Sequence, residues 1–436
     1  MTSSRAFCSQ AESPDVGTNA ENQTKSAFCS QAETSRRWLA IVGIGEDGTA
    51  GLGEEARRAI ADAEIVFGGA RHLELAADQI SGEPRPWPSP FAKALDEIEA
   101  LRGKKVCVLA SGDPFHFGVG ATLTRRIPAD EMRVFSAPSS FALAAARLGW
   151  PLQSVETVSL HGRPIALIRP LLHPGARILA LTSDGTAPAA IAELITKEGF
   201  GPSRFHVLEA LGGPREKQIS GMAAALSADG FDDLNVVAIE VAADEDARIL
   251  PLGSGLEDGL FEHDGQITKS EVRAVTLSAL APKRGERLWD IGAGSGSISI
   301  EWLRQHPSLS AIAIEADGER AARIARNAER MGVPQLTVVE GKAPAALAGL
   351  AAPDVVFIGG GATVPGLMEA AIAALGTGGR LVANGVTLET QALLIDCHGR
   401  HGGELIEIAI ARAAPVGGMT ALRPAMPVLQ WRWRKP

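Results

Sequence analysis

A glycine-rich loop directly after an apolar run carries the clearest chemical signal in the chain. The segment DIGAGSGS starts at Asp290 and places Gly292, Gly294 and Gly296 at alternate positions, just before a helical pattern. Glycines there let a ligand approach the backbone and leave free N–H groups near the helix start. A dinucleotide fingerprint, GxGxxG, would need glycine where this sequence has serine. The pattern GxGxG therefore predicts a nucleotide-like ligand without a pyrophosphate.

An acidic residue follows at the spacing that such a ligand needs. Glu315 ends the apolar run AIAIE about 20 residues further on, where a carboxylate can accept both hydroxyls of a ribose. S-adenosylmethionine has a ribose, a sulfonium and an amino-acid end but no phosphate, and Asp290 could face its cationic end. Loop and acid together predict an S-adenosylmethionine site, and a nucleotide-dependent oxidoreductase is the weaker alternative.

Two further segments should complete this site. Lys342, in EGKAP, stands where many methyltransferases have Asp or Asn to bind the adenine amine. Backbone groups of Gly341 and Ala343 are therefore expected to take over that contact. Gly359 and Gly360 begin a run of three glycines after the strand-like segment DVVFI, and ligands of open α/β sheets bind beyond such strand ends.

These motifs lie in a regular alternation of apolar runs and helical patterns. In the second half, helices are expected at 268–280, up to 305, up to 331, near 370 and at 388–401, with seven strands. The last two strands follow each other without an obvious helix, which predicts a doubly wound sheet closed by an antiparallel pair. In the first half, from Trp38, short runs of Val, Ile and Leu predict largely parallel strands buried on both faces.

The two alternations predict two domains and a tail. Between the two halves, the alternation of apolar runs and helical patterns stops in a Gly- and Asp-rich stretch. We therefore place a linker at 246–261, between a domain at 37–245 and another at 262–436. Residues 1–36 are polar, contain the segment AFCSQAE twice and lack periodicity. They predict a disordered tail, with a docking element as the alternative.

Bulk composition excludes several other classes of protein. The net charge of −9 argues against a nucleic-acid partner, since such binding rests on clustered Lys and Arg. No apolar run approaches the ~20 residues of a membrane span. Four cysteines without a CxxC pair or a Cys/His cluster predict no metal site and fit a reducing cytoplasm. The chain has no tyrosine, which excludes a phenolic acid or base.

Longer segments around these motifs resemble one family. HDGQITKSEVRA, LWDIGAGSGSISIEW, PDVVFIGGG and GRLVANGVT resemble the C-terminal half of the precorrin-6Y C5,15-methyltransferases (decarboxylating) of cobalamin biosynthesis. VGIGEDG, FGGARHL, LASGDPFHFG, APSS and SLHGR are similar to the tetrapyrrole methylase domain that precedes that half. The resemblance covers residues 38–436. It implies an α/β protein in which a class III tetrapyrrole methylase domain, built from two α/β subdomains, precedes a Rossmann-like class I methyltransferase domain.

The resemblance also implies a second S-adenosylmethionine site, in the first half. Gly112, Asp113 and Pro114 follow the strand VCVLA and would line it, although Gly-Asp-Pro is also a common turn sequence. Gly43 and Gly45 follow the first strand and would allow close backbone packing around the cleft.

Two positions in this first site depart from the usual family pattern. Glu46 stands where such loops usually have Pro, and Ala137 with Pro138 and Ser139 varies a common Pro-Gly-Ile-Ser turn. Ser139 is still expected at the donor site. The departures bear on the local shape of the site and remove no charged or polar group.

The implied reaction needs little from catalytic side chains. By similarity, reduced precorrin-6 is methylated at carbons 5 and 15 and loses carbon dioxide from the ring C acetate, giving precorrin-8. The first half would methylate one meso carbon, and the second half the other with the decarboxylation. Methyl transfer to carbon needs alignment and exclusion of water more than a strong acid. We therefore nominate no catalytic residue and no metal.

A tetrapyrrole with many carboxylates does need cationic partners. The candidates near the expected mouths of the two sites are Arg71, His72, His116 and Arg163 in the first half and Lys269 and Arg273 in the second. A solvated surface charge, or a capping role for a histidine, is the alternative for each.

Two other functions stay open from the sequence. One is a two-domain methyltransferase that acts on another tetrapyrrole without decarboxylation, and the other is a protein that only binds a corrin intermediate. For the favoured function we expect a cytoplasmic homo-oligomer with two S-adenosylmethionine sites, a small-molecule substrate, and no membrane or nucleic-acid partner.

Overall fold

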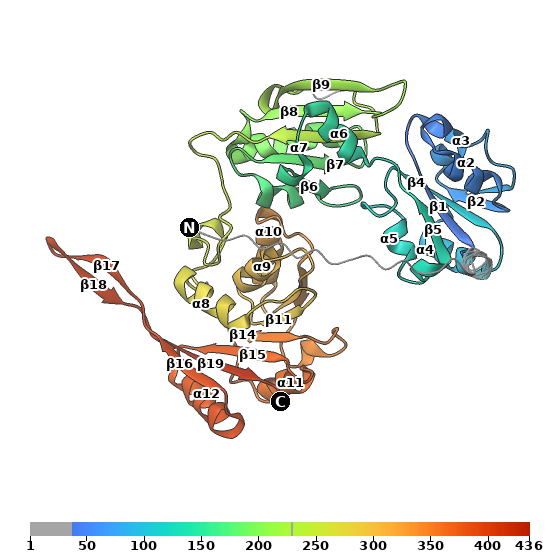
Figure 1. Ribbon diagram of the computed structural model, residues 1–436. Coiled ribbons are helices and arrows are strands. Elements are labelled where there is room, and N and C mark those ends of the chain that lie inside the picture. Colours follow the sequence, from blue (N-terminus) through green and yellow to red (C-terminus); the bar gives the residue numbers. More distant parts are fainter. Residues whose placement is uncertain (1–36, 228–229) are drawn as a thin grey trace, which may run out of the picture. The chain divides into compact units, whose positions relative to one another are not determined.

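Three β-sheets and one projecting hairpin make up the computed structural model, which describes residues 37–227 and 230–436 (Figure 1). The predicted tail and its repeat lie outside the described residues. Contacts divide the chain into two compact units. The first runs up to Gly149 and includes Ala210–Lys217, and the second comprises Trp150–Glu209 and Gln218–Pro436. These cuts do not coincide with the expected domain boundaries, which stay a prediction.

The first unit is a parallel sheet with the order β3-β2-β4-β1-β5. Its strands are β1 (Leu39–Ile44), β2 (Ile65–Gly68), β3 (Glu83–Pro86), β4 (Val106–Ser111) and β5 (Met132–Phe135). Its helices are η1 (Gly48–Gly51), α2 (Glu54–Ala61), α3 (Ala70–Leu75), α4 (Ala92–Ala100), α5 (Gly120–Leu123), η2 (Ala129–Glu131) and α6 (Ser140–Leu148). Strands β1 and β4 are almost wholly buried, as predicted for runs covered on both faces.

The second unit begins with a mixed sheet of order β6-β7-β10-β8-β9. Its strands are β6 (Glu156–Ser159), β7 (Arg177–Leu181), β8 (Arg204–Glu209), β9 (Lys217–Met222) and β10 (Asn235–Glu240). Its helices are η3 (Leu152–Ser154), η4 (Ile165–Leu171), α7 (Ala187–Ile195), η5 (Thr196–Phe200) and η6 (Ala223–Ala225). Strand β10 runs antiparallel to β7 and β8, so the expectation of largely parallel strands fails here. A central antiparallel strand buried on both faces has the same continuous apolar sequence as a parallel one.

The last sheet has seven strands in the order β13-β12-β11-β14-β15-β19-β16. They are β11 (Arg287–Ile291), β12 (Ser310–Glu315), β13 (Thr337–Glu340), β14 (Val355–Ile358), β15 (Arg380–Gly385), β16 (Glu404–Ile408) and β19 (Val428–Arg434). The helices are η7 (Asp258–Leu260), α8 (Ser270–Leu280), α9 (Ser297–Arg304), α10 (Gly318–Arg330), η8 (Ala345–Leu347), α11 (Leu367–Ala374) and α12 (Leu388–His401). Strand β19 is antiparallel to β15 and β16, which confirms the predicted closing pair.

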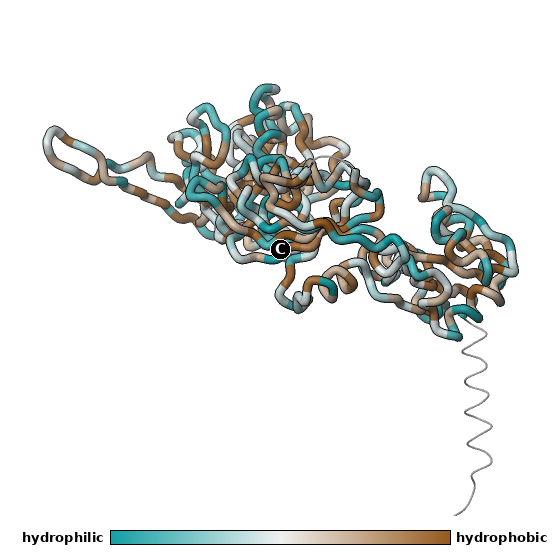
Figure 2. The backbone as a smooth tube through the Cα atoms, turned by 90° about the horizontal axis from the view of Figure 1, so that it is seen from above, coloured by the Kyte–Doolittle hydropathy of each residue, from teal (hydrophilic) through white to brown (hydrophobic). Residues whose placement is uncertain are grey.

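A two-stranded hairpin interrupts that closing pair and was not predicted. Among the described strands, β17 (Ala411–Val416) and β18 (Met419–Pro424) pair only with each other, and they extend away from the rest of the sheet (Figure 1). We call this hairpin the arm. Apolar stretches alternate with polar ones along it in Figure 2, and Met419 and Leu422 are 80% and 72% exposed. The two-glycine turn at Gly417 and Gly418 is the sequence signal that could have revealed it.

The expected linker is packed into the core of the last sheet. Leu250, Leu256 and Phe261 are buried in the same cluster as residues of α8, α9 and β11. Arg273 of α8, which is 0% exposed, holds the segment in place. Its guanidinium donates to the Leu256 carbonyl and, over 2.5 Å, to the buried carboxylate of Glu301 in α9.

This position corrects the prediction that Arg273 binds substrate. Its remaining N–H groups face the Thr268 carbonyl and Asp258, and its guanidinium stacks over Phe261. The residue was expected at the surface because a charged side chain in a helix usually is. Its burial depends on partners from the linker and from α9, which sequence spacing does not show.

Replacing Arg273 by Met should therefore destabilise the protein without a direct effect on ligand binding. The change leaves the buried Glu301 carboxylate unpaired, a loss of about 3–5 kcal/mol in the free energy of unfolding. Urea denaturation measures it. Arg326→Met, which opens the exposed pair with Glu262, is the control and should change the free energy of unfolding little, because water screens an exposed pair. Equal losses in the two variants would contradict the structural role of Arg273.

Candidate functional site

The glycine loop after β11 adopts the backbone that its glycines were predicted to allow. Gly292, Gly294 and Gly296 all have φ between +60° and +74°, which side chains disfavour. A Cβ on Gly292 would lie 2.8 Å from the carbonyl oxygen of Gly360, in the loop after β14. The two loops therefore touch backbone to backbone at the carboxyl edge of the sheet, next to the start of α9.

Glu315 lies beside this loop, at the end of β12. One carboxylate oxygen accepts from the Gly294 N–H over 2.8 Å, and the other accepts from the Asp317 N–H over 3.1 Å. The Asp317 side chain in turn caps α10 by accepting from the Arg320 N–H. Each carboxylate oxygen has a further lone pair, so the fixed carboxylate can still accept hydroxyls of a ribose.

Asp290 is a buried carboxyl with one unsatisfied oxygen. Oδ2 accepts from the N–H and the hydroxyl of Ser299, over 3.1 and 2.5 Å. Oδ1 has no hydrogen-bond partner among the described residues. Burial raises the pKa of Asp290 to about 6, against the opposing hydrogen bonds from Ser299. A nearby cationic ligand group would favour the ionised form.

A cavity of about 910 Å³ opens over these residues. Its wall contains Glu315 and, of the predicted donor-site residues, also Gly292, Gly294, Gly341, Ala343, Gly359 and Gly360. The buried Asp290 and Gly296 do not line it, and a Cβ on Gly296 would lie 2.7 Å from the Ile324 side chain. Small-molecule sites typically measure about 300–1,000 Å³. The cavity is thus large enough for a donor and part of a second molecule.

The residues present fit S-adenosylmethionine. Ser295 lines the cavity, and its buried hydroxyl has no partner in the described part of the chain. The Gly341 N–H already donates to the Glu315 carbonyl over 2.8 Å, so only the Gly341 carbonyl is free to meet an adenine amine. Lys342 is exposed at the cavity wall.

Charged side chains surround the outer part of the same cavity. Lys269 lines it, as its predicted substrate role requires, and lies 3.5 Å from Asp258. Arg320 and Arg412 also line it and were not predicted. Arg412 lies at the root of the arm, so nothing in the sequence placed it near the glycine loop.

In the first unit, three strand ends meet as closely as those around Gly292. A Cβ on Gly43 would lie 1.8 Å from the Gly112 carbonyl oxygen, and one on Gly112 would lie 2.7 Å from that of Pro138. The Ala137 N–H donates to the Gly112 carbonyl over 3.3 Å. The carboxyl end of β1 and the loops after β4 and β5 thus form one tight edge, with Ser139 capping α6 beside it.

Further predicted residues extend this edge. The Asp113 carboxylate accepts from the Phe115 N–H, and the Pro114 carbonyl accepts from Gly120. His116 lies 3.1 Å from the Ser139 hydroxyl and stacks with Phe117. Gly45 leaves room for the Asp47 side chain, because a Cβ on Gly45 would lie 2.7 Å from the Asp47 carboxylate.

Arg71 and His72 lie together in a polar network with Glu46 and Ser111. Arg71 pairs with the Glu46 carboxylate, and the Ser111 hydroxyl lies 2.8 Å from His72 Nε2. Burial, with a smaller effect of Arg71, lowers the pKa of His72 to about 4. His72 is neutral at neutral pH at this pKa, so it would meet a substrate as a hydrogen-bond donor or acceptor, and its place in substrate binding stays a prediction. Arg163, an exposed residue, belongs to the other unit.

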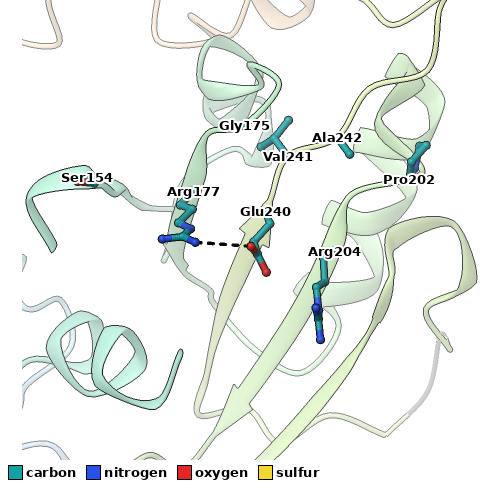
Figure 3. A pocket seen from close by; sticks show the side chains of 8 residues that line it. All are labelled: Ser154, Gly175, Arg177, Pro202, Arg204, Glu240, Val241 and Ala242. Atoms are coloured by element: carbon teal, nitrogen blue, oxygen red, sulfur yellow. Dashed lines mark ion pairs between the residues drawn. The ribbon is translucent and has the colours of Figure 1, made fainter. Parts of the chain in front are cut away.

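A second hollow, of about 500 Å³, lies at one end of the mixed sheet (Figure 3). Arg177 and Glu240 point toward each other across it, 3.9 Å apart, and Arg177 also packs over Trp150. Glu240 is in register with Arg177 and Arg204, so cross-strand pairing accounts for these charges. None of the predicted site residues lies there.

In residues 37–227 and 230–436 there is no group of three or more His, Cys, Asp or Glu that could hold a metal ion. Over the same residues, no helix has the length and apolar character of a membrane span.

Comparison with known proteins matches both parts of the chain. The tetrapyrrole (corrin/porphyrin) methylases match residues 39–227, and a precorrin methyltransferase domain matches residues 259–435. A precorrin-6Y C(5,15)-methyltransferase (decarboxylating) from a Sinorhizobium species is 63% identical over 398 residues, 91% of this chain and 96% of that protein. The chain belongs to the precorrin-6Y C(5,15)-methyltransferase family.

Other relatives match either most of the chain or less than half of it. The Mycobacterium tuberculosis enzyme is 42% identical over 397 residues, which cover 90% of this chain and 98% of that protein. The cobalt-precorrin-6B C(15)-methyltransferase (decarboxylating) of Salmonella typhimurium is 33% identical over 180 residues, 40% of this chain and 92% of that protein. A solved C-terminal domain of a precorrin-6Y C5,15-methyltransferase from Rhodobacter capsulatus is 47% identical and covers 43% of this chain and 100% of its own, with a TM-score of 0.41.

The raised pKa of Asp290 predicts how ligand-free stability depends on pH. The pKa of Asp290 is about 6 in the folded protein and near 4 in the unfolded chain. The stability that the buried neutral carboxyl contributes is therefore fully present below about pH 4 and is lost as the pH rises through 6. The loss amounts to about 3 kcal/mol. Asp290→Asn stays neutral, so it should gain stability relative to the parent protein between pH 4 and 7. Urea unfolding across that range measures the difference.

Ser299→Ala provides the control for this pH dependence. It removes a hydroxyl that stabilises the ionised carboxylate, so it should move the loss to higher pH. If the difference in the free energy of unfolding between Asp290→Asn and the parent protein does not grow with rising pH, Asp290 does not titrate in this range.

Proposed function

We propose that this protein uses S-adenosylmethionine to methylate reduced precorrin-6 at carbons 5 and 15 and removes the ring C acetate carboxyl as carbon dioxide, giving precorrin-8. The observation that carries the proposal is the 63% identity to a precorrin-6Y C(5,15)-methyltransferase (decarboxylating) over 96% of that protein. The cavity beside Glu315 supports it, because its lining fits the donor that such an enzyme requires.

We further propose two donor sites, one for each half. The loops at Gly43, Gly112 and Ser139 would serve the domain at 37–245, and the cavity would serve the domain at 262–436, after the packed segment 246–261. The Salmonella relative, which spans 40% of this chain, is named for C(15) methylation and decarboxylation alone. This supports assigning those two steps to one half and C5 methylation to the other.

In the second half, the side chains would position the donor. Glu315 would accept the ribose hydroxyls, and the backbone at Gly292 and Gly294 would leave space for the amino-acid end. The buried Asp290 would place negative potential toward the donor's cationic end. The narrow edge formed with Gly359 and Gly360 would keep water from the reacting atoms.

The substrate itself would carry the electrons. Breaking the bond between the acetate methylene and its carboxyl releases carbon dioxide and passes the electron pair through the conjugated macrocycle to the meso carbon. That carbon forms a bond to the donor methyl, while the sulfur keeps the electron pair of the broken S–C bond and becomes a thioether. The atoms balance without an acid, a metal or a covalent enzyme intermediate.

Mass spectrometry after anaerobic incubation with reduced precorrin-6 and methyl-labelled donor should show two added methyl groups and the loss of one carbon dioxide. Glu315→Ala should weaken donor binding in the second half by about 100-fold, since charged hydrogen bonds are lost. Its product should carry one methyl group and keep the carboxyl.

Other outcomes of that assay identify the alternatives. Two methyl groups without loss of carbon dioxide would point to a methyltransferase that does not decarboxylate. Donor binding with an unchanged tetrapyrrole would point to a protein that only holds the intermediate.

We also propose that the protein is a cytoplasmic homo-oligomer and that the arm takes part in its assembly. An isolated two-stranded hairpin is marginally stable in water, and its unpaired edges invite another strand. Val416, Met419 and Leu422 are exposed along it. A second copy of the same arm would cover both features.

Met419→Asp combined with Leu422→Asp should shift the protein from an oligomer toward the monomer in light scattering, because two charges replace exposed apolar side chains of the arm. Leu388→Asp is the matched control, since Leu388 is 80% exposed and belongs to α12, not to the arm. An unchanged mass for the arm variant, or an equal change for the control, would contradict this role.

A further inference from the structure

The root of the arm forms part of the wall of the second-half cavity. Ile410, just before the first strand, and Arg412, within it, line the cavity, and Ala425 and Met426 line it just after the second strand. Arg412 is in register with Arg423 across the hairpin. Residues paired in this way share one face of a hairpin, but of these two only Arg412 lines the cavity.

Arg412 is held by a carboxylate that also lines the cavity. Its Nε lies 3.2 Å from an oxygen of Glu271, and a terminal N–H donates to the other oxygen. Glu271 belongs to the first turn of α8 and also accepts from the Ser270 hydroxyl. The two side chains are 50% and 43% exposed. Ion pairs at this exposure contribute little to stability, so this one can open for a competing carboxylate.

Apolar side chains form the neighbouring part of the wall. Val272, Ile408 and Val428 pack against one another and line the cavity next to Arg412 and Ile410. An apolar setting disfavours a carboxylate and so favours its loss as carbon dioxide, whereas an arginine would stabilise the carboxylate and slow that loss. The reacting acetate and an anchoring carboxylate therefore need different surroundings, and this cavity has both.

We propose that Arg412 binds a peripheral carboxylate of the tetrapyrrole, which displaces Glu271, and so orients the ring C acetate toward Val272, Ile408 and Val428. The inference rests on the proposed function, since it names the substrate contact of the same site. Glu271 holds the guanidinium in place while the cavity awaits substrate. Arg412 is a specificity-determining residue in this scheme, and Glu271 competes with the substrate.

Three variants test the exchange through the dissociation constant of reduced precorrin-6, measured anaerobically by absorbance titration in the presence of S-adenosylhomocysteine. Arg412→Gln should raise it at least about 10-fold, because a bidentate charged contact is lost. Glu271→Gln should lower it about threefold or more, because the competing carboxylate is gone. Arg423→Gln, the matched control on the facing strand, should leave it unchanged. All variants should bind S-adenosylhomocysteine as the parent does.

The opposite changes in the dissociation constant expected for Arg412→Gln and Glu271→Gln distinguish this role from that of a structural ion pair. A pair that merely holds the arm would give the same direction of change in Arg412→Gln and Glu271→Gln, or none, and either result would overturn the proposal. Equal effects of Arg412→Gln and Arg423→Gln would overturn it as well. Parent protein that binds the tetrapyrrole without turnover would contradict the proposed function while the comparison of binding constants still stands.

Discussion

Backbone contact between neighbouring strand ends is the constraint on which both candidate sites depend. Gly292 meets Gly360 in the loops after β11 and β14, and Gly43, near the end of β1, meets Gly112 in the loop after β4, in two separate sheets. A side chain at Gly43 or Gly292 would force these loops apart. Because the loops stay close, free N–H groups, carbonyls and helix starts collect at one edge of each sheet, where a ligand can meet many of them at once.

The buried polar groups around the second edge divide into two kinds. Arg273 and Glu301 satisfy each other and tie α8 to α9, so they stabilise the wall of the cavity. Within the part of the chain that the structure describes, Asp290 and Ser295 each leave one buried polar oxygen without a partner, which costs free energy in the absence of ligand. Groups of the first kind position the site, whereas those of the second kind are expected to gain partners when a donor binds.

Features that depend on neighbouring residues in the sequence were predictable. The glycine loop, Glu315 and the glycines after β14 follow from strands that end where helices begin, and the structure brings them to one cavity. Burial was not predictable, because it depends on distant segments. Arg273 reaches partners in the linker, and the environment of His72 lowers its pKa. The arm was not predicted although Gly417 and Gly418 mark its turn, because its two exposed strands lack the continuous apolar runs that indicate the buried strands.

The packed segment at 246–261 bears on how such a two-part chain can be divided. The family match of the second half begins at residue 259, yet Leu250 and Leu256 belong to its core and the N–H groups of Gly255 and Leu256 donate to Glu301. A gene split at the family boundary would strip that half of two core side chains and leave part of a buried carboxylate bare. The joining segment has become part of the fold it joins, so separating the two activities by gene fission would require the second fragment to keep these residues as its own amino terminus.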